Sequence, residues 1–425
     1  MKYISNNLNY ANFFYFLLPL SLLVGFYFNE DASAGGASHD FYLTWKFNVL
    51  LKENLYYALT NSHLAGGTDH FPLGHLIVSL ALFFTNEKDA VRLIFCILYL
   101  SIPYLFYLNL KTKFPKINSN KLLLFASLIF LLPAYRYSAI WTSDHNTASI
   151  FFLLSTLSFL RWEKEKNYNT LNLNIILNVI FLALALYCRQ YYVIIFLYFM
   201  LVYFQKLKLG TFIKLSAFVF LLAIPGFWLV FHQISLLISI YSSDYPNSIL
   251  VTTSILSLYL IPIFFFLLLN EKEIFLKLYN DKKNKIYLYS CFSVLIVLLI
   301  SLTSFDYNYK IGGGFFLKLS LILFNNYFLF YCTSALGIIL LIYLSLEDKN
   351  SLFLFLLFIF ALSGYYIFQK YYEPTFLFIF FLILNTKIPE LFLKNMKNII
   401  YFYIYIFIYL SSALINDILQ ISNSL

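Results

Sequence analysis

Long apolar runs separated by short polar stretches fill the chain from end to end. A helix needs about 20 apolar residues to cross a bilayer, within a range of roughly 17 to 25. Thirteen runs meet or approach this length: Tyr10–Phe28, Ala90–Leu108, Leu122–Tyr135, Thr147–Leu160, Leu171–Tyr187, Tyr191–Phe204, Thr211–Phe231, Ile249–Leu269, Ile286–Leu302, Tyr327–Leu346, Ser351–Phe368, Thr375–Asn385 and Ile399–Leu414. The pattern predicts an all-α, polytopic integral membrane protein with about 13 transmembrane helices. Residues 1–425 are expected to form a single multi-span membrane domain.

The apolar stretch His70–Phe84 is short for a span and is interrupted by a proline, a glycine and a histidine. Stretches of roughly 10–14 apolar residues are more often interfacial or re-entrant than spanning. With this stretch on the membrane surface and Lys2 in the cytoplasm, most Lys and Arg residues fall on the cytoplasmic side, as the positive-inside rule requires. Residues 29–89 then form a long first extracytoplasmic loop with juxtamembrane helices. Residues 136–146 and 303–326 are among the later outer loops.

Composition supports a membrane protein and excludes several other classes. Hydrophobic residues make up 61% of the chain and charged residues 12%, whereas a soluble domain has roughly 45–50% and 25%. The 37 Tyr and 50 Phe exclude disorder, and apolar runs such as 217–231 exclude an outer-membrane barrel with its alternating strands. The net charge of +9 follows from basic cytoplasmic loops, so nucleic acid is not an expected partner.

No sequence motif indicates a resident cofactor. The four cysteines have no metal-ligand or redox spacing and are interpreted as packing residues. No Walker motif, GxGxxG fingerprint or HExxH is present, and the run Gly312-Gly313-Gly314 is interpreted as a flexible outer loop. We expect no resident cofactor. The outer histidines and carboxylates supply ligand types for a divalent metal, but a metal is the less favoured alternative because they lack the tight spacing of a dedicated site.

The first outer loop concentrates the residues that could perform chemistry. It holds four of the six histidines, His39, His63, His70 and His75, together with Asp40 and Asp69. Asp40 begins an amphipathic run that includes Trp45 and would lie along the membrane interface. A carboxylate that is partly desolvated there has a raised proton affinity and is a candidate general base. The alternative is a solvated loop whose charges are simply exposed to water.

Further polar residues recur at the outer ends of later spans. They are Asp144, His145, Arg189, Gln190, Lys370, Tyr372 and Glu373. Singly, each fits a side chain that snorkels to water. Together they would place acids and bases around one outer cavity, in which Arg189 and Lys370 bind an anionic phosphate. Asp40 or Asp144 would engage an acceptor hydroxyl.

At these residues the chain resembles the GT-C superfamily of multi-span glycosyltransferases, which use polyprenyl-phosphate sugars. Those enzymes carry an acidic residue in a long first outer loop, a proline-containing segment near the end of that loop, and a second acidic residue on a later outer loop. Asp40, the stretch 69–74 and Asp144 follow that order.

The nearest likeness is to the dolichyl-phosphate-glucose alpha-1,2-glucosyltransferases. It is carried by Asp40-Phe41-Tyr42, Thr142-Ser143-Asp144 and Arg189-Gln190-Tyr191-Tyr192, and it covers roughly the N-terminal half. The chain departs from that family where Tyr191-Tyr192 replaces Thr-Asn and where Asp144 stands for Glu.

The resemblance implies an inverting hexosyltransferase that acts on the extracytoplasmic face. Its partners would be the lipid bilayer, a polyprenyl-phosphate sugar as donor, and a lipid-linked or surface glycan as acceptor. Asp40 and Asp144 are the expected catalytic residues; the expected substrate-binding residues are His39, Trp45, Asp69, His70, His145, Arg189, Gln190, Lys370, Tyr372 and Glu373. The residue composition suits an AT-biased bacterium, hence an inner membrane with a periplasmic site, or an ER membrane with a lumenal site in a eukaryote.

Two alternatives from other classes stay open. A polymerase or ligase of surface polysaccharide is also multi-span, but it usually has its large outer loop in the second half. A transporter or flippase would carry ionisable residues near the membrane midplane and broken helices. Here the span interiors carry almost no charge, and Pro225-Gly226 is the main internal helix breaker.

Overall fold

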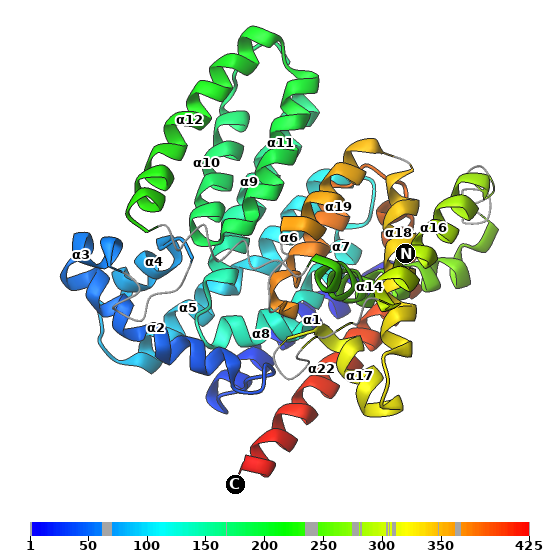
Figure 1. The fold of residues 1–425 in the computed structure, drawn as a ribbon, viewed down its shortest axis with the longest axis horizontal. Helices are drawn as coiled ribbons and strands as arrows, with labels where there is room; N and C mark the ends of the chain where they lie inside the picture. The colour runs from blue at the N-terminus through cyan, green and yellow to red at the C-terminus, as the bar shows by residue number, and fades with distance from the viewer. Residues whose placement is uncertain are drawn as a thin grey trace. The chain divides into compact units, whose positions relative to one another are not determined.

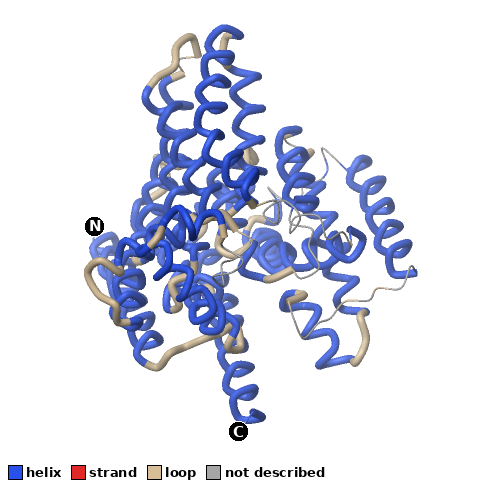
Figure 2. Tube along the Cα trace, turned by 60° about the vertical axis from the view of Figure 1, so that its left-hand side comes forward, coloured by secondary structure: helices blue, strands red, loops and turns tan. Residues whose placement is uncertain are grey.

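The computed structural model describes residues 2–61, 70–166, 168–233, 245–273, 280, 283–302, 305, 307, 312–346, 348–361 and 367–424. Within these residues every regular element is a helix, and no strand occurs (Figure 2). The chain divides into two compact units, one formed by Met1–Leu237 with Ile406–Leu425 and the other by Ile238–Tyr405. The predicted all-α class is therefore confirmed.

The first unit contains the helices of the N-terminal half (Figure 1). They are α1 (Lys2–Tyr27), α2 (Gly36–Glu53), α3 (Leu55–Thr60), α4 (Leu73–Ala81), α5 (Lys88–Tyr99), α6 (Ser101–Lys113), α7 (Ser119–Ser127), η2 (Leu128–Leu131), α8 (Pro133–Ile140), α9 (Asp144–Glu165), α10 (Leu173–Cys188), η3 (Gln190–Tyr192), α11 (Val193–Lys206) and α12 (Leu209–His232).

The second unit contains the remaining helices (Figure 1). They are α14 (Tyr245–Asn270), α16 (Lys283–Leu302), α17 (Gly314–Phe324), α18 (Phe328–Ser345), α19 (Lys349–Ala361), η4 (Gln369–Tyr371), α20 (Thr375–Phe378), the π-helical turn η5 (Ile379–Ile383), α21 (Ile388–Lys394) and the first part of α22 (Met396–Ser424). The last part of α22 belongs to the first unit.

Several of these helices are long and apolar enough to cross a bilayer. Among the described residues there are five: Lys88–Lys113, Leu209–His232, Asn247–Asn270, Phe328–Ser345 and Met396–Asp417. Two bent pairs of shorter helices bring the number to seven if each pair counts as one span. The structure thus supports a multi-pass helical membrane protein, and the figure of thirteen spans stays a prediction.

The break in one of the bent pairs falls within the predicted span Leu122–Tyr135, where the chain turns by 66° before Pro133. Leu132 has an extended backbone because proline disfavours the helical conformation of the residue before it. Pro133 then begins α8, at a position where its missing N–H costs nothing. The predicted outer loop 136–146 is consequently wrong in part, since Arg136 lies within α8 and Asp144 begins α9.

The predicted loop 303–326 is also partly helical, because α17 occupies Gly314–Phe324. The three glycines before and at its start all have positive φ, a region in which glycine avoids the steric cost of a Cβ atom. Gly313 donates a backbone hydrogen bond of 2.9 Å to Ile367, and a Cβ atom on Gly312 would overlap the Ile367 carbonyl. The glycine run is therefore an ordered close contact, and its interpretation as a flexible loop is wrong.

Hydrogen bonds between neighbouring helices hold the first unit together alongside apolar packing. The Asn178 amide of α10 donates to Ser155 Oγ of α9 at 2.8 Å, and its oxygen accepts from Tyr203 of α11 at 2.9 Å. All three side chains are buried. Side-chain hydrogen bonds of this kind link helices where lipid offers no hydrophobic drive for their association.

The predicted first loop folds into α2, α3 and α4, none of which is among the five helices long enough to span. Asp31 organises the start of α2, because its carboxylate accepts from the backbone N–H groups of Ser33 at 3.1 Å and Ser38 at 2.8 Å. At the other end of α2, Lys52 donates to the Leu82 carbonyl at 2.7 Å, just beyond α4. The loop is therefore a folded part of the first unit.

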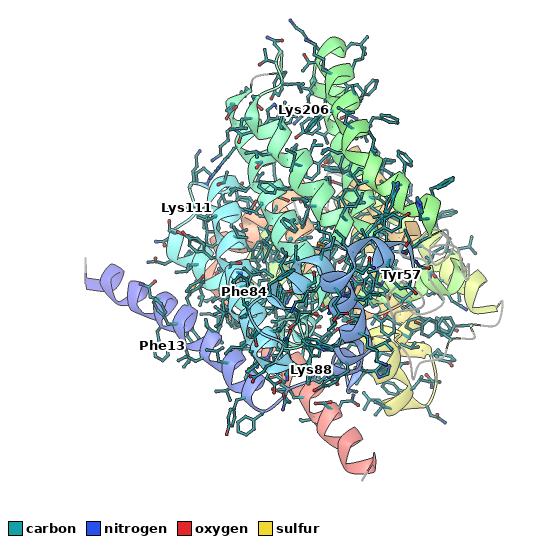
Figure 3. The ribbon with its side chains drawn as sticks, turned by 90° about the vertical axis from the view of Figure 1, so that its left-hand side faces the viewer. Phe13, Tyr57, Phe84, Lys88, Lys111 and Lys206 are labelled. Carbon is teal, nitrogen blue, oxygen red and sulfur yellow. The ribbon has the colours of Figure 1, made fainter. Side chains whose placement is uncertain are left out.

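The first unit also separates lysines that the positive-inside rule assigns to opposite faces. Figure 3 shows Lys206, at the end of α11, and Lys88, at the start of α5, at opposite ends of the unit. Lys111, which the predicted orientation places on the same face as Lys206, lies between the two in this view, so the orientation stays a prediction.

A buried ion pair joins the loop after α1 to α8. Arg136 donates to Glu30 through Nε at 2.6 Å and through Nη2, and it also bonds to the Ser21 and Phe130 carbonyls. The two side chains are 4% and 10% exposed, so the guanidinium has little access to water. Sequence reasoning treated Arg136 only as a loop residue.

Glu30→Ala should lower the stability of the folded protein by about 3–5 kcal/mol, because it leaves the buried Arg136 without its carboxylate. Thermal unfolding in detergent measures the effect as a fall in Tm of several degrees. The exposed Glu87 of the same unit provides the matched control, and Glu87→Ala should leave Tm nearly unchanged. Equal Tm values for the two variants would contradict a structural role for the buried pair.

Candidate functional site

Polar side chains from four segments of the first unit converge at the N-terminus of α9. The centre is an ion pair between Asp144, the first residue of α9, and Arg189, which directly follows α10. Arg189 donates to the same carboxylate oxygen, Oδ1, through Nε at 2.7 Å and through Nη2. The pair forms because α9 and α10 pack along each other and bring the N-terminus of α9 next to the C-terminus of α10.

Both members of this pair are buried, at 7% exposure each. Burial alone would raise the pKa of the Asp144 carboxyl, but the charge and hydrogen bonds of Arg189 outweigh it and hold that pKa below its ordinary value. Asp144 is therefore a carboxylate at neutral pH, and the positive end of the α9 dipole favours the same charge state.

Three histidines surround the ion pair. His70 Nδ1 lies 3.1 Å from Gln190 Oε1, and His145 Nδ1 lies 3.2 Å from the Tyr191 hydroxyl, with the two rings stacked. The third, His75 of α4, is bonded at 2.9 Å to Asn48 of α2. Burial lowers the pKa of His75; the Asp144 carboxylate opposes this and the Arg189 charge adds to it, and the net result is a lowered pKa, so His75 is neutral at pH 7.

Gly74 brings α4 against the carboxylate. A Cβ atom at this position would overlap Cβ of Asp144 and would stand 3.4 Å from its Cα atom. The glycine thus permits a close approach that no larger residue allows. The segment 70–75 supplies a histidine on each side of this contact.

The turn that leads into α9 has an unusual backbone. Thr142 has a φ of 55°, and a β-branched residue in the left-handed region is a genuine outlier that costs about 1–3 kcal/mol. Its hydroxyl Oγ1 and the second oxygen of Asp144, Oδ2, are both buried without a hydrogen-bond partner among the described residues. Ser143, between them, is only half buried, so the turn reaches the surface.

The predicted catalytic residue Asp40 lies on the exposed side of α2 together with His39, and Trp45 is half buried one turn further on. The two aromatic residues that directly follow Asp40, Phe41 and Tyr42, have their rings 6.2 Å and 6.0 Å from the ring of Trp141, the residue before Thr142. This contact links the start of α2 to the turn before α9. Asp69 lies outside the described residues.

The other three predicted residues belong to the second unit, where they form a separate cluster. Glu373 is 2% exposed and accepts a hydrogen bond from the Tyr259 hydroxyl, and Tyr372 bonds to Thr252 at 2.6 Å. Lys370 is half buried, with its ammonium group 5.3 Å from the Phe368 ring. The structure describes this cluster by itself, so a single cavity shared by Arg189 and Lys370 stays a prediction.

Sequence reasoning missed several residues of the first cluster. Asn48 lies on the buried face of α2 with Phe41 and Leu51, and this helical spacing would have marked it as a buried polar residue. The contact made by Gly74 and the left-handed conformation of Thr142 have no signal in the sequence, because both depend on the packing of α4 and α8 against α9.

No group of three His, Cys, Asp or Glu side chains in the described part of the chain is arranged to hold a metal ion. The comparisons with known proteins give no relative: no protein-family model, no curated protein and no solved structure matches this chain. The class that the fold defines is a multi-pass, all-helical membrane protein, and its function rests on the site itself.

Gly74→Ala should destabilise the protein by about 1–3 kcal/mol, because the added methyl group overlaps Asp144 in a packed region. Gly210→Ala in α12 is the matched control, since no atom lies within 4 Å of its Cβ position and alanine is the better helix former. Thermal unfolding should separate the two variants by several degrees. A Gly74→Ala protein that is as stable as Gly210→Ala would disprove the close contact.

Proposed function

We propose that this protein is a membrane glycosyltransferase of the GT-C type. It would move a hexose from a polyprenyl-phosphate donor to a lipid-linked or surface glycan acceptor on the extracytoplasmic face. The observation that supports this most is the buried Asp144–Arg189 pair, which has histidines around it and one carboxylate oxygen without a hydrogen-bond partner among the described residues. Buried ionisable groups in a membrane protein are costly and mark functional sites.

In the proposed reaction the acceptor hydroxyl attacks the anomeric carbon of the hexose in a single displacement. The bond between that carbon and the phosphate oxygen breaks, its electron pair leaves with the polyprenyl phosphate, and the configuration inverts. Asp40 accepts the proton of the attacking hydroxyl. The Arg189 guanidinium stabilises the negative charge that develops on the leaving phosphate.

Asp40 keeps the role of base that the resemblance implies. The structure leaves its side chain exposed within the protein, so the partial desolvation expected from the sequence is not provided by the described residues. The rings that follow Asp40 on α2 contact Trp141, so the start of α2 lies beside the turn that carries Asp144. Asp144 and His145 would orient the substrates, while His70 and Gln190 would line the entrance beside Arg189. Lys370, Tyr372 and Glu373 keep the substrate-binding role that the resemblance implies.

A transporter or flippase is the second candidate, and one observation favours it. Each unit contains a pair of helices bent at a short break, by 66° in the first and 97° in the second. Broken helices in corresponding halves are typical of transporters that bind substrate near the membrane midplane. Solute flux into liposomes that requires no sugar donor would select this function.

Asp40→Asn should lower the turnover of hexose transfer by about 10²–10⁴-fold, which is the usual contribution of general-base catalysis. The assay incubates purified protein with a polyprenyl-phosphate hexose and a lipid-linked glycan acceptor, and it follows release of polyprenyl phosphate. Asp89→Asn is the matched control, since Asp89 is an exposed carboxylate of the same predicted loop, and its amide oxygen would still accept from Arg92. Unchanged turnover of Asp40→Asn would remove Asp40 from the mechanism.

A further inference from the structure

The turn Thr142–Asp144 presents two buried oxygen atoms that lack partners among the described residues, Thr142 Oγ1 and Asp144 Oδ2. The two residues are 8% and 7% exposed, so solvent satisfies neither atom. Buried polar atoms in folded proteins are nearly always hydrogen-bonded, and an exception calls for an explanation. Both atoms lie at the start of α9, next to the half-buried Ser143.

The chemistry of the two atoms narrows the class of ligand. A carboxylate oxygen only accepts hydrogen bonds, so its partner must be a donor. The charge of Asp144 is already compensated by Arg189 through Oδ1, so that donor need not be a cation. A threonine hydroxyl both donates and accepts, which suits a second hydroxyl group. Among the substrates of the proposed reaction, the group that offers adjacent neutral O–H donors is the sugar.

The backbone conformation of Thr142 also supports a role for its hydroxyl in binding. Glycine and asparagine adopt a positive φ more readily than threonine, so a turn kept only for its shape would be better made by either of them. What threonine offers at this position, and glycine lacks, is the hydroxyl. Strain of this kind persists mostly at sites where it serves binding or catalysis.

We infer that the Thr142–Asp144 turn is the subsite for the hexose of the donor, with Asp144 Oδ2 and Thr142 Oγ1 bonded to two adjacent sugar hydroxyls. This inference rests on the proposed function, because it assigns the hexosyl group of a polyprenyl-phosphate donor to the turn. It makes Thr142 a specificity-determining residue for the sugar. Phe41 and Tyr42 pack against the neighbouring Trp141 and hold the turn in place.

The test measures donor binding without transfer, by titrating the purified protein with polyprenyl-phosphate glucose, mannose or galactose and following tryptophan fluorescence. Trp141, the residue immediately before the turn, is the nearest fluorescent reporter in the sequence. Thr142→Gly should weaken the affinity for the preferred hexose about fivefold to tenfold, the usual effect of losing one hydrogen bond. The Tm of the Thr142→Gly protein should stay the same or rise, because glycine adopts the positive φ without the steric cost of a Cβ atom.

Deoxy analogues of the preferred donor identify the hydroxyl. Removing the hydroxyl that bonds to Thr142 should weaken binding to the natural protein by a similar factor, and it should have no further effect on Thr142→Gly. Thr142→Ser should retain the affinity, and the isosteric Thr142→Val should lose it. If Thr142→Ser also loses affinity, or if Thr142→Gly binds as the natural protein does, the assignment is wrong.

Lys166→Gly is the matched control, since Lys166 also has a positive φ, at the other end of α9, and its side chain is exposed. It should raise or keep Tm without changing donor affinity. The binding result is independent of the transfer assay. If binding depends on the hydroxyl but no polyprenyl phosphate is released, the proposed function is refuted and the subsite is kept. If polyprenyl phosphate is released but the Thr142 variants bind the donor as the natural protein does, the subsite is refuted and the proposed function is kept.

Discussion

Inside a bilayer, polar groups have no water to bond with, so each must find its partner within the protein. The described helices meet this constraint by pairing their few buried polar side chains across helix contacts. The Asn178 amide satisfies groups on two neighbouring helices, and Arg136 directs its N–H groups to a carboxylate and to carbonyl oxygens. Pairing is incomplete at a small number of buried atoms of the described residues, and Asp144 Oδ2 is the one that belongs to a buried ion pair of the candidate site.

The two buried arginine–carboxylate pairs of the first unit differ in this respect. Arg136 bonds to both oxygens of Glu30, so that carboxylate is fully engaged and the pair serves the fold. Arg189 gives two N–H groups to one oxygen of Asp144 and leaves the other oxygen unbonded. A pair that only held α9 to α10 would gain from using both oxygens, as the bidentate geometry of arginine allows. The unused oxygen is the observation on which the proposed hexose subsite rests.

The sequence predicted most of the helices, because an apolar run in a membrane protein has few alternatives. The run Thr211–Phe231, for example, lies within α12 and differs from it by two residues at one end and one at the other. Prolines were harder to interpret. Pro225 lies inside a continuous helix, whereas Pro133 sits at a 66° bend, and the difference depends on neighbouring helices that satisfy the freed backbone groups.

The site was predictable in its parts but not in its assembly. Asp144 and Arg189 were recognisable as polar residues at the ends of consecutive spans, and that adjacency made their meeting foreseeable. The left-handed turn at Thr142 was not, since threonine is among the residues least expected there and only the packing of α8 against α9 imposes it.

The ion pair also has a consequence for the order of events in the proposed reaction. A donor phosphate that approaches Arg189 shares the guanidinium with Asp144. The positive charge of Arg189 then compensates the negative charge of Asp144 less fully. A nearby anion raises the proton affinity of a carboxylate, so Asp144 would accept a hydrogen bond from a sugar hydroxyl more strongly once the phosphate is bound. The phosphate and the sugar of one donor would therefore reinforce each other's binding through a single ion pair. A free sugar, which has no phosphate, would lack that reinforcement and bind less well.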